Sequence, residues 1–273
     1  MTNYISFRSG GAGRSLANPL LLTGNGAVPQ PALGPFQGAD LIRAVSGKHL
    51  LFGVHGYATS FQRGANIMAA LEAGLSLPSS ASFFGVLWPG DSWLPYVNYS
   101  WEADDAVFCG RRLAALCNGP FRSAASVSFV SHSLGGRVIL EAAANLVGRK
   151  ARVVCLMAAA VDCDVLTGQY RAALDRSENV YVLSSTKDLV LRAAYPVGDA
   201  ISDIFLGDRD SPFRRALGLE GPSPAAGPAV SDDRIRGDPG CNHWDYLPGG
   251  NRWAQIPPYI RGSFYRAPPT WPG

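Results

Sequence analysis

Short apolar runs alternate with stretches of helical periodicity along most of the chain, and this alternation restricts the possible folds more than any other feature. The runs expected as strands are "HLLFGVHGY", "ASFFGVLWPG", "SVSFVS", "ARVVCLMAAAV" and "NVYVLSS". Helical stretches such as "GANIMAALEAGL" and "YSWEADDAVFCGRRLAALC" lie between them, and "GGRVILEAAANLVG" is expected to end at Gly148. Apolar strands that alternate with helices are typical of a parallel sheet covered on both sides. The sequence therefore predicts an α/β fold with a mostly parallel central sheet and helices on both faces.

Two segments interrupt this pattern. Residues 1–48 are rich in Gly, Ala and Pro and contain strand-like pieces at residues 4–7 and 40–45, so we expect an N-terminal extension there. Residues 189–241 combine several prolines with many glycines and mixed charge, which indicates a long irregular insertion. Such insertions often act as lids or binding loops, and a loop without a role is the alternative. The 273 residues are expected to form one domain with a substantial core.

The composition argues against several classes of protein. With 47% hydrophobic and 16% charged residues, the chain is expected to fold rather than to be disordered. A net charge of +3 without a cluster of Lys or Arg gives no indication of nucleic-acid binding. The five cysteines contain no C-x-x-C pair, which argues against a zinc site or a full disulfide framework.

The N-terminus lacks the basic start and the continuous apolar stretch of a signal peptide. No apolar run approaches the length of a membrane helix. We therefore expect a cytoplasmic protein without stable membrane insertion, and a secreted form that has lost its signal peptide is compatible with the same sequence.

The stretch "SVSFVSHSLGGRVIL" places Ser133 between a predicted strand and a predicted helix. A sharp strand-to-helix turn exposes a nucleophilic serine, and small residues two positions before and after it let the strand and the helix approach closely. These positions hold Ser131 and Gly135. The usual pattern has Gly at both, but Ser131 is small enough for the turn to form. A structural corner with a chance serine is the alternative interpretation.

A serine nucleophile needs a base, and the four histidines differ in their suitability. His132 is adjacent to Ser133, so its side chain should point away from the hydroxyl. His49 begins a strand, which is the wrong end for a site in a parallel sheet. His55 lies in the "HGY" loop, where another role is expected. His243, in the late loop "CNHWDY", therefore remains as the candidate base.

The base must be oriented by an acid, which should lie at a strand end between Ser133 and His243. The stretch "VYVLSSTKDLVL" places Asp188 just after the fifth predicted strand. We prefer it to Asp162 and Asp164, which follow the fourth strand. A helix cap or a solvated loop carboxylate is the alternative reading of each of the three.

An oxyanion hole needs two backbone N–H groups. One is expected from Leu134, which follows the nucleophile at the start of the helix. The loop "FGVHGYATS" would supply the second from Tyr57, because Gly56 permits an unusual backbone there. His55 would then tie down the loop. A simple strand-ending glycine is the alternative.

These motifs resemble the α/β-hydrolase fold from about residue 49 to about residue 247, and more narrowly a bacterial subgroup catalogued as hydrolases of unknown function. The resemblance is carried by "FGVHGYATSFQRG", "GVLWPG", "VSHSLGGRVILEA" and "SSTKDLVL". It implies the roles of nucleophile for Ser133, acid for Asp188, base for His243, and oxyanion donors for Tyr57 and Leu134. It does not cover the first 45 or so residues or residues 189–241, where we expect substrate choice to lie.

The resulting hypothesis is a serine hydrolase of the carboxylesterase or lipase type. It would cleave short- to medium-chain esters through an acyl-enzyme on Ser133. No metal or organic cofactor is implied, and the expected partner is a small-molecule ester. The aromatic stretch "WPGDSWLPYVNYSW" lies at a strand end, and Trp93 and Tyr96 are its candidates for a substrate pocket. Packing of these aromatic side chains against the sheet is the alternative.

Two other functional hypotheses remain open. A thioesterase, amidase or peptidase would use the same three side chains. A non-catalytic, hydrolase-like binding module is a different class, and the complete set of Ser, Asp and His argues against it. A dehalogenase is excluded because its nucleophile would be an aspartate in place of Ser133. A nucleotide-binding function is excluded because "HSLGG" is not the G-x-G-x-x-G phosphate loop.

Overall fold

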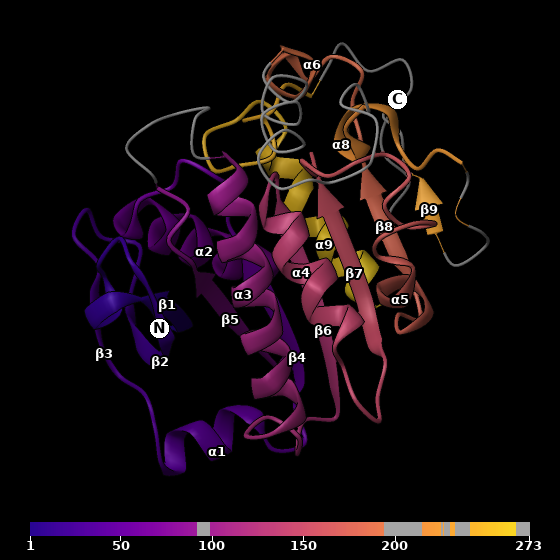
Figure 1. The fold of residues 1–273 in the computed structure, drawn as a ribbon. Helices are drawn as coiled ribbons and strands as arrows, with labels where there is room; N and C mark the ends of the chain where they lie inside the picture. Colours follow the sequence, from indigo (N-terminus) through magenta and orange to yellow (C-terminus); the bar gives the residue numbers. More distant parts are fainter. Residues whose placement is uncertain (92–98, 194–214, 225, 227–229, 233–240, 266–273) are drawn as a thin grey trace.

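The computed structural model describes residues 1–91, 99–193, 215–224, 226, 230–232 and 241–265, and within them the strands form one nine-stranded sheet (Figure 1). The strand order is β3-β2-β1-β5-β4-β6-β7-β8-β9. The strands are β1 (Thr2–Arg8), β2 (Leu16–Asn25), β3 (Ala32–Pro35), β4 (His49–Val54), β5 (Ala81–Leu87), β6 (Ser126–His132), β7 (Ala151–Met157), β8 (Val180–Leu183) and β9 (Val230–Asp232). The helices are α1 (Ala39–Val45), α2 (Phe61–Leu75), α3 (Tyr99–Asn118), α4 (Gly135–Ala144), α5 (Arg171–Asp175), α6 (Leu189–Ala193), α8 (Leu217–Glu220) and α9 (Ile256–Phe264), with single 3₁₀ turns at Ser9–Gly11 and Trp253–Gln255.

The sheet is parallel except for β2, which runs against both of its neighbours. In the centre, β4 pairs with β5 on one side and with β6 on the other over its whole length, so that Val54 lies between Val86 and Ser131. The carboxyl ends of these strands are therefore level. The loops that follow them meet at one edge of the sheet, which is where a site is expected in an open parallel sheet.

Helices cover both faces of the sheet, as the sequence predicts. In Figure 1, α3 and α4 lie in front of the sheet and α9 lies behind it. Phe52 of β4 and Phe84 of β5 pack on Phe121, which follows α3, with ring centroids 5.3 to 6.0 Å apart. Side chains alternate along a strand, and a Cβ at the next residue, Gly53, would instead meet Met68 of α2. Each face of the sheet is thus covered by its own helices, and the buried side chains of both faces belong to one apolar cluster.

The N-terminal 48 residues contribute the strands β1, β2 and β3 to the sheet. The predicted strand at residues 4–7 is confirmed within β1, which pairs with β5. The strand-like reading of residues 40–45 is wrong, because they form most of α1. Leu41, Ala44 and Val45 pack on the core at helical spacing, which the short window disguised. Strands β2 and β3 were not predicted.

The helix after Ser133 is shorter than its sequence pattern. It ends at Ala144, and the Asn145 side chain donates a hydrogen bond to the Glu141 carbonyl. Gly148, expected as the end of this helix, lies in the following turn with φ of +70°. The helix therefore ends four residues before Gly148, the residue at which the sequence pattern placed its end.

Part of the expected insertion at 189–241 is regular structure at the edge of the sheet. β9 pairs with β8, and α8 docks on the loop after β7 through backbone hydrogen bonds. The Gly218 N–H donates to the Ala159 carbonyl, and the Ser185 N–H donates to the Gly218 carbonyl, both at 2.9 Å. The remainder of the lid hypothesis concerns residues 194–214 and 233–240, which lie outside the described residues.

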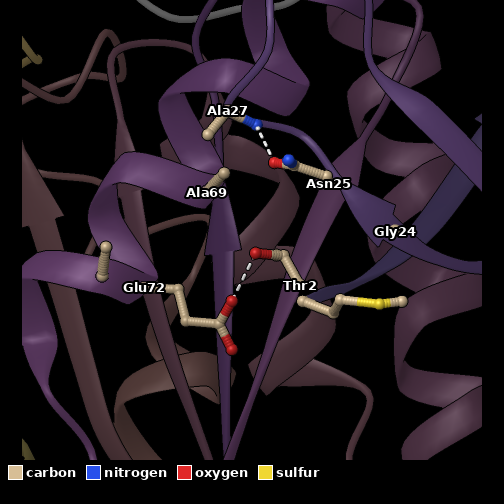
Figure 2. Close-up of a pocket in the computed structure, with 8 residues that line it drawn as sticks. Thr2, Gly24, Asn25, Ala27, Ala69 and Glu72 are labelled. Carbon is tan, nitrogen blue, oxygen red and sulfur yellow. Dashed lines mark hydrogen bonds between the residues drawn. The ribbon is translucent and has the colours of Figure 1, made fainter.

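A cavity of about 460 Å³ lies beside the amino end of β1 (Figure 2). Its wall includes Thr2, Asn25 and Glu72, and the Thr2 hydroxyl donates a hydrogen bond to the Glu72 carboxylate. Burial raises the pKa of Glu72. Because β1 runs parallel to β5, β4 and β6, this cavity is at the opposite edge of the sheet from Ser133. In the described part of the chain, no helix is long and apolar enough to span a membrane.

Candidate active site

Ser133 occupies a strained turn between β6 and α4. Its φ is +54°, a left-handed conformation that non-glycine residues rarely adopt. The Ser133 N–H donates to the Met157 carbonyl at 3.0 Å, and its own carbonyl accepts from Gly136 at 2.9 Å. A Cβ at Gly135 would lie 2.6 Å from the His55 carbonyl oxygen, so only glycine allows this approach of helix and strand. The geometry is that of a strand-to-helix nucleophile elbow.

Ser131 stands where the usual elbow has a glycine, and the turn forms around it. The side chain is buried in β6, and its hydroxyl has no hydrogen-bond partner in the described structure. The departure from the pattern thus leaves one buried polar atom unsatisfied without preventing the turn.

Three side chains predicted from separate parts of the sequence meet at this turn. His243 Nε2 is 3.0 Å from the Ser133 hydroxyl oxygen, and His243 Nδ1 is 2.8 Å from Asp188 Oδ2. All three residues are buried, with Asp188 fully inaccessible to solvent. The other Asp188 oxygen, Oδ1, accepts the Leu191 N–H at 2.9 Å and so caps α6. The helix-cap alternative for Asp188 is therefore correct for one oxygen, while the other oxygen holds the histidine.

The loop that carries His243 is fixed by its own polar side chains. The Asp245 carboxylate accepts the N–H groups of Asn242 at 2.8 Å and of Asn251 at 3.2 Å. The Asn242 side-chain oxygen accepts the His243 N–H at 2.9 Å and the Leu189 N–H at 3.4 Å. Asn242 therefore ties the loop of His243 to the start of α6, directly after Asp188.

The other three histidines have structural contacts, as their positions suggested. His49, at the opposite edge, contacts the Ser126 hydroxyl at 2.8 Å. The His132 ring packs against the His243 ring with centroids 4.7 Å apart, and its Nε2 donates to the His243 carbonyl at 2.8 Å. Burial and the neighbouring His243 hold the pKa of His132 well below its usual value. His132 is therefore neutral, and it positions the backbone of the loop opposite Ser133.

The loop after β4 lies directly against Ser133. A Cβ at Gly56 would lie 2.8 Å from the Ser133 Cβ and 2.9 Å from His132 Nδ1, which makes glycine necessary here. His55 is buried, its ring stacks on Trp88, and Trp88 Nε1 donates to the His55 carbonyl at 2.8 Å. Burial lowers the pKa of His55 to about 3, so it is a neutral support of the loop.

The two expected oxyanion donors flank this contact. Leu134 is the N-cap residue of α4 and follows Ser133. Tyr57 follows Gly56 in the loop after β4. Each of them therefore adjoins in sequence one partner of the contact between Gly56 and Ser133, and the two come from different strand ends.

The aromatic candidates for a substrate pocket have a different outcome. Trp93 and Tyr96 lie outside the described residues. Trp88 is fully buried and supports the loop of His55. Instead, the sequence reasoning missed Trp244, which is 42% exposed and packs edge-on against the His243 ring at 5.2 Å. The Arg63 guanidinium lies 5.2 Å from the centre of the Trp244 ring.

The arrangement can move a proton from a serine hydroxyl to an imidazole that a buried carboxylate orients. The position of Trp244 beside His243 in the sequence was the available signal for an aromatic wall at this site. In the described residues, no group of three or more His, Cys, Asp or Glu side chains is placed to hold a metal ion.

The parallel sheet, the elbow at Ser133 and the level strand ends define the α/β-hydrolase class. The chain belongs to the family described as "alpha/beta hydrolase of unknown function (DUF900)", whose family model matches residues 38–217. This confirms the expected fold and the resemblance. The match ends before His243 and begins after β1. No curated protein matches the chain in sequence.

Solved structures of two esterases are similar to parts of the chain. Esterase B from Lactobacillus rhamnosis is 16% identical in an inhibited form and 14% in a second structure. Both matches have a TM-score of 0.30 and cover 58% of this chain, and they span about half of the esterase (51% and 50%). A thermophilic esterase from Thermogutta terrifontis with bound butyrate is 10% identical, with 80% of this chain and 81% of that chain covered and a TM-score of 0.33.

Proposed function

We propose that the protein is a serine hydrolase that cleaves carboxylic esters with short- to medium-chain acyl groups through an acyl-enzyme on Ser133. The observation that carries the proposal is the chain of hydrogen bonds from Ser133 to His243 and from His243 to Asp188. It is built on a serine whose backbone has a left-handed conformation. Strain of this kind is retained where the surrounding structure enforces it, and it clusters at functional sites.

In the proposed first step, the Ser133 oxygen attacks the ester carbonyl carbon, and His243 Nε2 takes the hydroxyl proton. Asp188 holds the imidazole through Nδ1 and stabilises the positive charge that forms on it. The carbonyl oxygen becomes an oxyanion, which the N–H groups of Tyr57 and Leu134 would stabilise. When the tetrahedral intermediate collapses, the C–O bond breaks and the alcohol leaves with the proton from His243. A water molecule then attacks the acyl-enzyme by the same route and releases the acid.

The surroundings of His243 support an apolar acyl or alcohol group of modest size. Trp244 presents a partly exposed ring beside the imidazole, and Arg63 covers part of that ring. A small ester can contact this wall while its carbonyl lies at Ser133.

Covalent labelling with a fluorophosphonate probe tests the proposed nucleophile. The probe reacts with serines activated by a base, so we expect one adduct, located at Ser133 by peptide mass spectrometry. Ser133→Ala should abolish the adduct, and His243→Ala should slow labelling by at least about a hundredfold because the hydroxyl loses its base. An adduct at another residue, or labelling that survives Ser133→Ala, would contradict the proposal.

A panel of substrates tests the type of bond and the chain length. We expect p-nitrophenyl acetate, butyrate and hexanoate to be hydrolysed with higher kcat/KM than the palmitate ester. An acyl-thioester and an acyl-anilide matched to the best ester separate the thioesterase and amidase alternatives. Higher kcat/KM for either one would replace the esterase assignment, while a labelled Ser133 would retain the serine hydrolase.

A further inference from the structure

Arg8 is a fully buried arginine at the carboxyl end of β1, the strand next to β5. Its Nη1 donates to Asp91 Oδ1 at 2.7 Å and to the Gly13 carbonyl at 3.2 Å. Its Nη2 donates to the Thr59 carbonyl at 2.9 Å. One side chain therefore joins three loops at the edge of the sheet where Ser133 lies.

The contact with Thr59 is the one that reaches the candidate active site. Thr59 is buried two residues after Tyr57, and its hydroxyl donates back to the Tyr57 carbonyl at 3.2 Å. The Thr59 N–H donates to the Gly90 carbonyl at 3.3 Å, in the loop that also carries Asp91. The end of the loop after β4 is thus held on its carbonyl side by Arg8 and on its amide side by Gly90.

Between Tyr57 and Thr59 the backbone is strained. Ala58 has φ of +54°, the left-handed region that disfavours residues with a Cβ. A residue held in this region costs of order 1–3 kcal/mol and persists only when its surroundings enforce it. The hydrogen bonds on Thr59 are the restraints that the structure shows on the far side of Ala58.

We propose that Arg8 is a positioning residue that holds the strained loop after β4 so that the Tyr57 N–H stays aimed at the oxyanion, with Asp91 as its counter-ion. The inference rests on the proposed hydrolase function. It assigns a role in the reaction to β1, which lies outside the region matched by the family model. The side-chain hydrogen bonds of Arg8 go to Gly13, Thr59 and Asp91, so we infer that it acts on Tyr57 through Thr59 and Ala58.

Arg8→Lys is the informative substitution because lysine keeps the charge and loses the planar fork that reaches several acceptors at once. We expect kcat for the best ester to fall by about tenfold to a hundredfold, since one oxyanion donor is worth roughly a hundredfold or more. KM should change by less than about threefold, because the donor acts mainly on the transition state. A peptidyl or alkyl boronic acid, whose tetrahedral oxygen mimics the oxyanion, should bind more weakly by the same factor as kcat/KM.

Ala58→Gly in the Arg8→Lys background distinguishes positioning from general destabilisation. Glycine adopts positive φ without steric cost, so the loop needs less restraint, and we expect at least about tenfold recovery of kcat. Arg149→Lys is the matched control. Arg149 is a half-buried arginine that donates to the carbonyls of Phe121 and Ala124 at the opposite edge, and its variant should keep kcat within about twofold, whatever its Tm.

Two results with Arg8→Lys would overturn the inference. One is wild-type kcat and boronate affinity in Arg8→Lys. The other is a loss of kcat that Ala58→Gly fails to restore. If Arg8→Lys does not accumulate as folded protein, Asp91→Asn is the substitute, because it weakens the ion pair that holds the Arg8 side chain. An unchanged kcat in Asp91→Asn would also overturn the inference. Fluorophosphonate labelling of wild type separates the two proposals: an unlabelled Ser133 removes the hydrolase function itself, whereas a labelled Ser133 with an unaffected Arg8→Lys removes only the role of Arg8.

Discussion

At the scale of single residues, Asp188 uses its two carboxylate oxygens for different purposes. Oδ2 contacts the His243 ring, and Oδ1 caps the first turn of α6. The cap fixes the position of the carboxylate, and the carboxylate fixes the tautomer and orientation of the imidazole. Local helix chemistry and the proposed catalysis therefore depend on the same side chain.

These two roles can be separated by substitution. Asp188→Asn keeps a side-chain oxygen for the Leu191 N–H but removes the charge that favours protonated His243. We expect kcat to fall by roughly a thousandfold to ten-thousandfold with little change in Tm. Asp188→Ala should show a similar kcat loss and, in addition, a free energy of unfolding lower by about 1 kcal/mol from the lost cap. Equal kcat in wild type and Asp188→Asn would refute the role of the carboxylate.

At the scale of elements, α8 supports the site from outside the central strands. Its Gly218 accepts the Ser185 N–H, and the Ser185 carbonyl accepts the Asp188 N–H at 3.1 Å. The loop of the proposed acid is therefore attached to a short helix in the segment 189–241. The helix can dock this closely because residue 218 has no Cβ.

A methyl group at this position should disrupt the attachment. A Cβ on Gly218 would lie 2.3 Å from both Ala158 C and Ala159 N, which are backbone atoms that must move. We expect Gly218→Ala to lower the free energy of unfolding by about 2 kcal/mol or more and to lower kcat as the Ser185 loop shifts. Urea unfolding and ester hydrolysis measure the two effects. The control is Gly34→Ala in β3, where a Cβ meets nothing within 4 Å, and it should change the free energy of unfolding by less than about 1 kcal/mol. Equal losses of stability in Gly218→Ala and Gly34→Ala would contradict this account of α8.

At the scale of the whole molecule, two buried histidines make the folded state sensitive to acid. His55 and His132 are both buried, and desolvation is the main cause of their lowered pKa values. Both support the loops around Ser133, so the burial that builds the site also disfavours protonation of these two imidazoles in the folded state.

The direction of the pH dependence follows from His55. Its pKa is about 3 in the folded protein and 6.5 in the unfolded chain, so between these values only the unfolded state binds the proton. The contribution to stability is complete above pH 6.5 and is lost progressively as the pH falls toward 3, by at most about 5 kcal/mol. Urea unfolding at pH 7.5, 5.5 and 4.0 should show this decline, and His55→Gln should reduce its slope. A free energy of unfolding that stays constant from pH 7.5 to 4.0 would contradict the assignment.

Several features of the fold were readable in advance for a definite reason. Strands β4 to β8 are apolar on both faces because helices cover both sides of the sheet, and this leaves a strong signal in the sequence. β3 is an edge strand, β2 lies next to it, and both are only partly buried, so their pattern is weak. The residues 40–45 fit a strand or a helix equally well over so short a window.

By itself, the sequence determined the order and type of the central elements and the sharp turn at Ser133, because burial and backbone geometry act locally on residue choice. Which of the candidate carboxylates reaches His243 was decided by which strand ends become neighbours in the sheet, and only the folded loop decided that the Trp244 ring packs edge-on against the His243 ring and stays partly exposed. The same holds for Arg8, whose contacts with Gly13, Thr59 and Asp91 join loops that are far apart in the chain. The contacts with Thr59 and Asp91 leave no periodic trace in a sequence, since they depend on the pairing of β1 with β5.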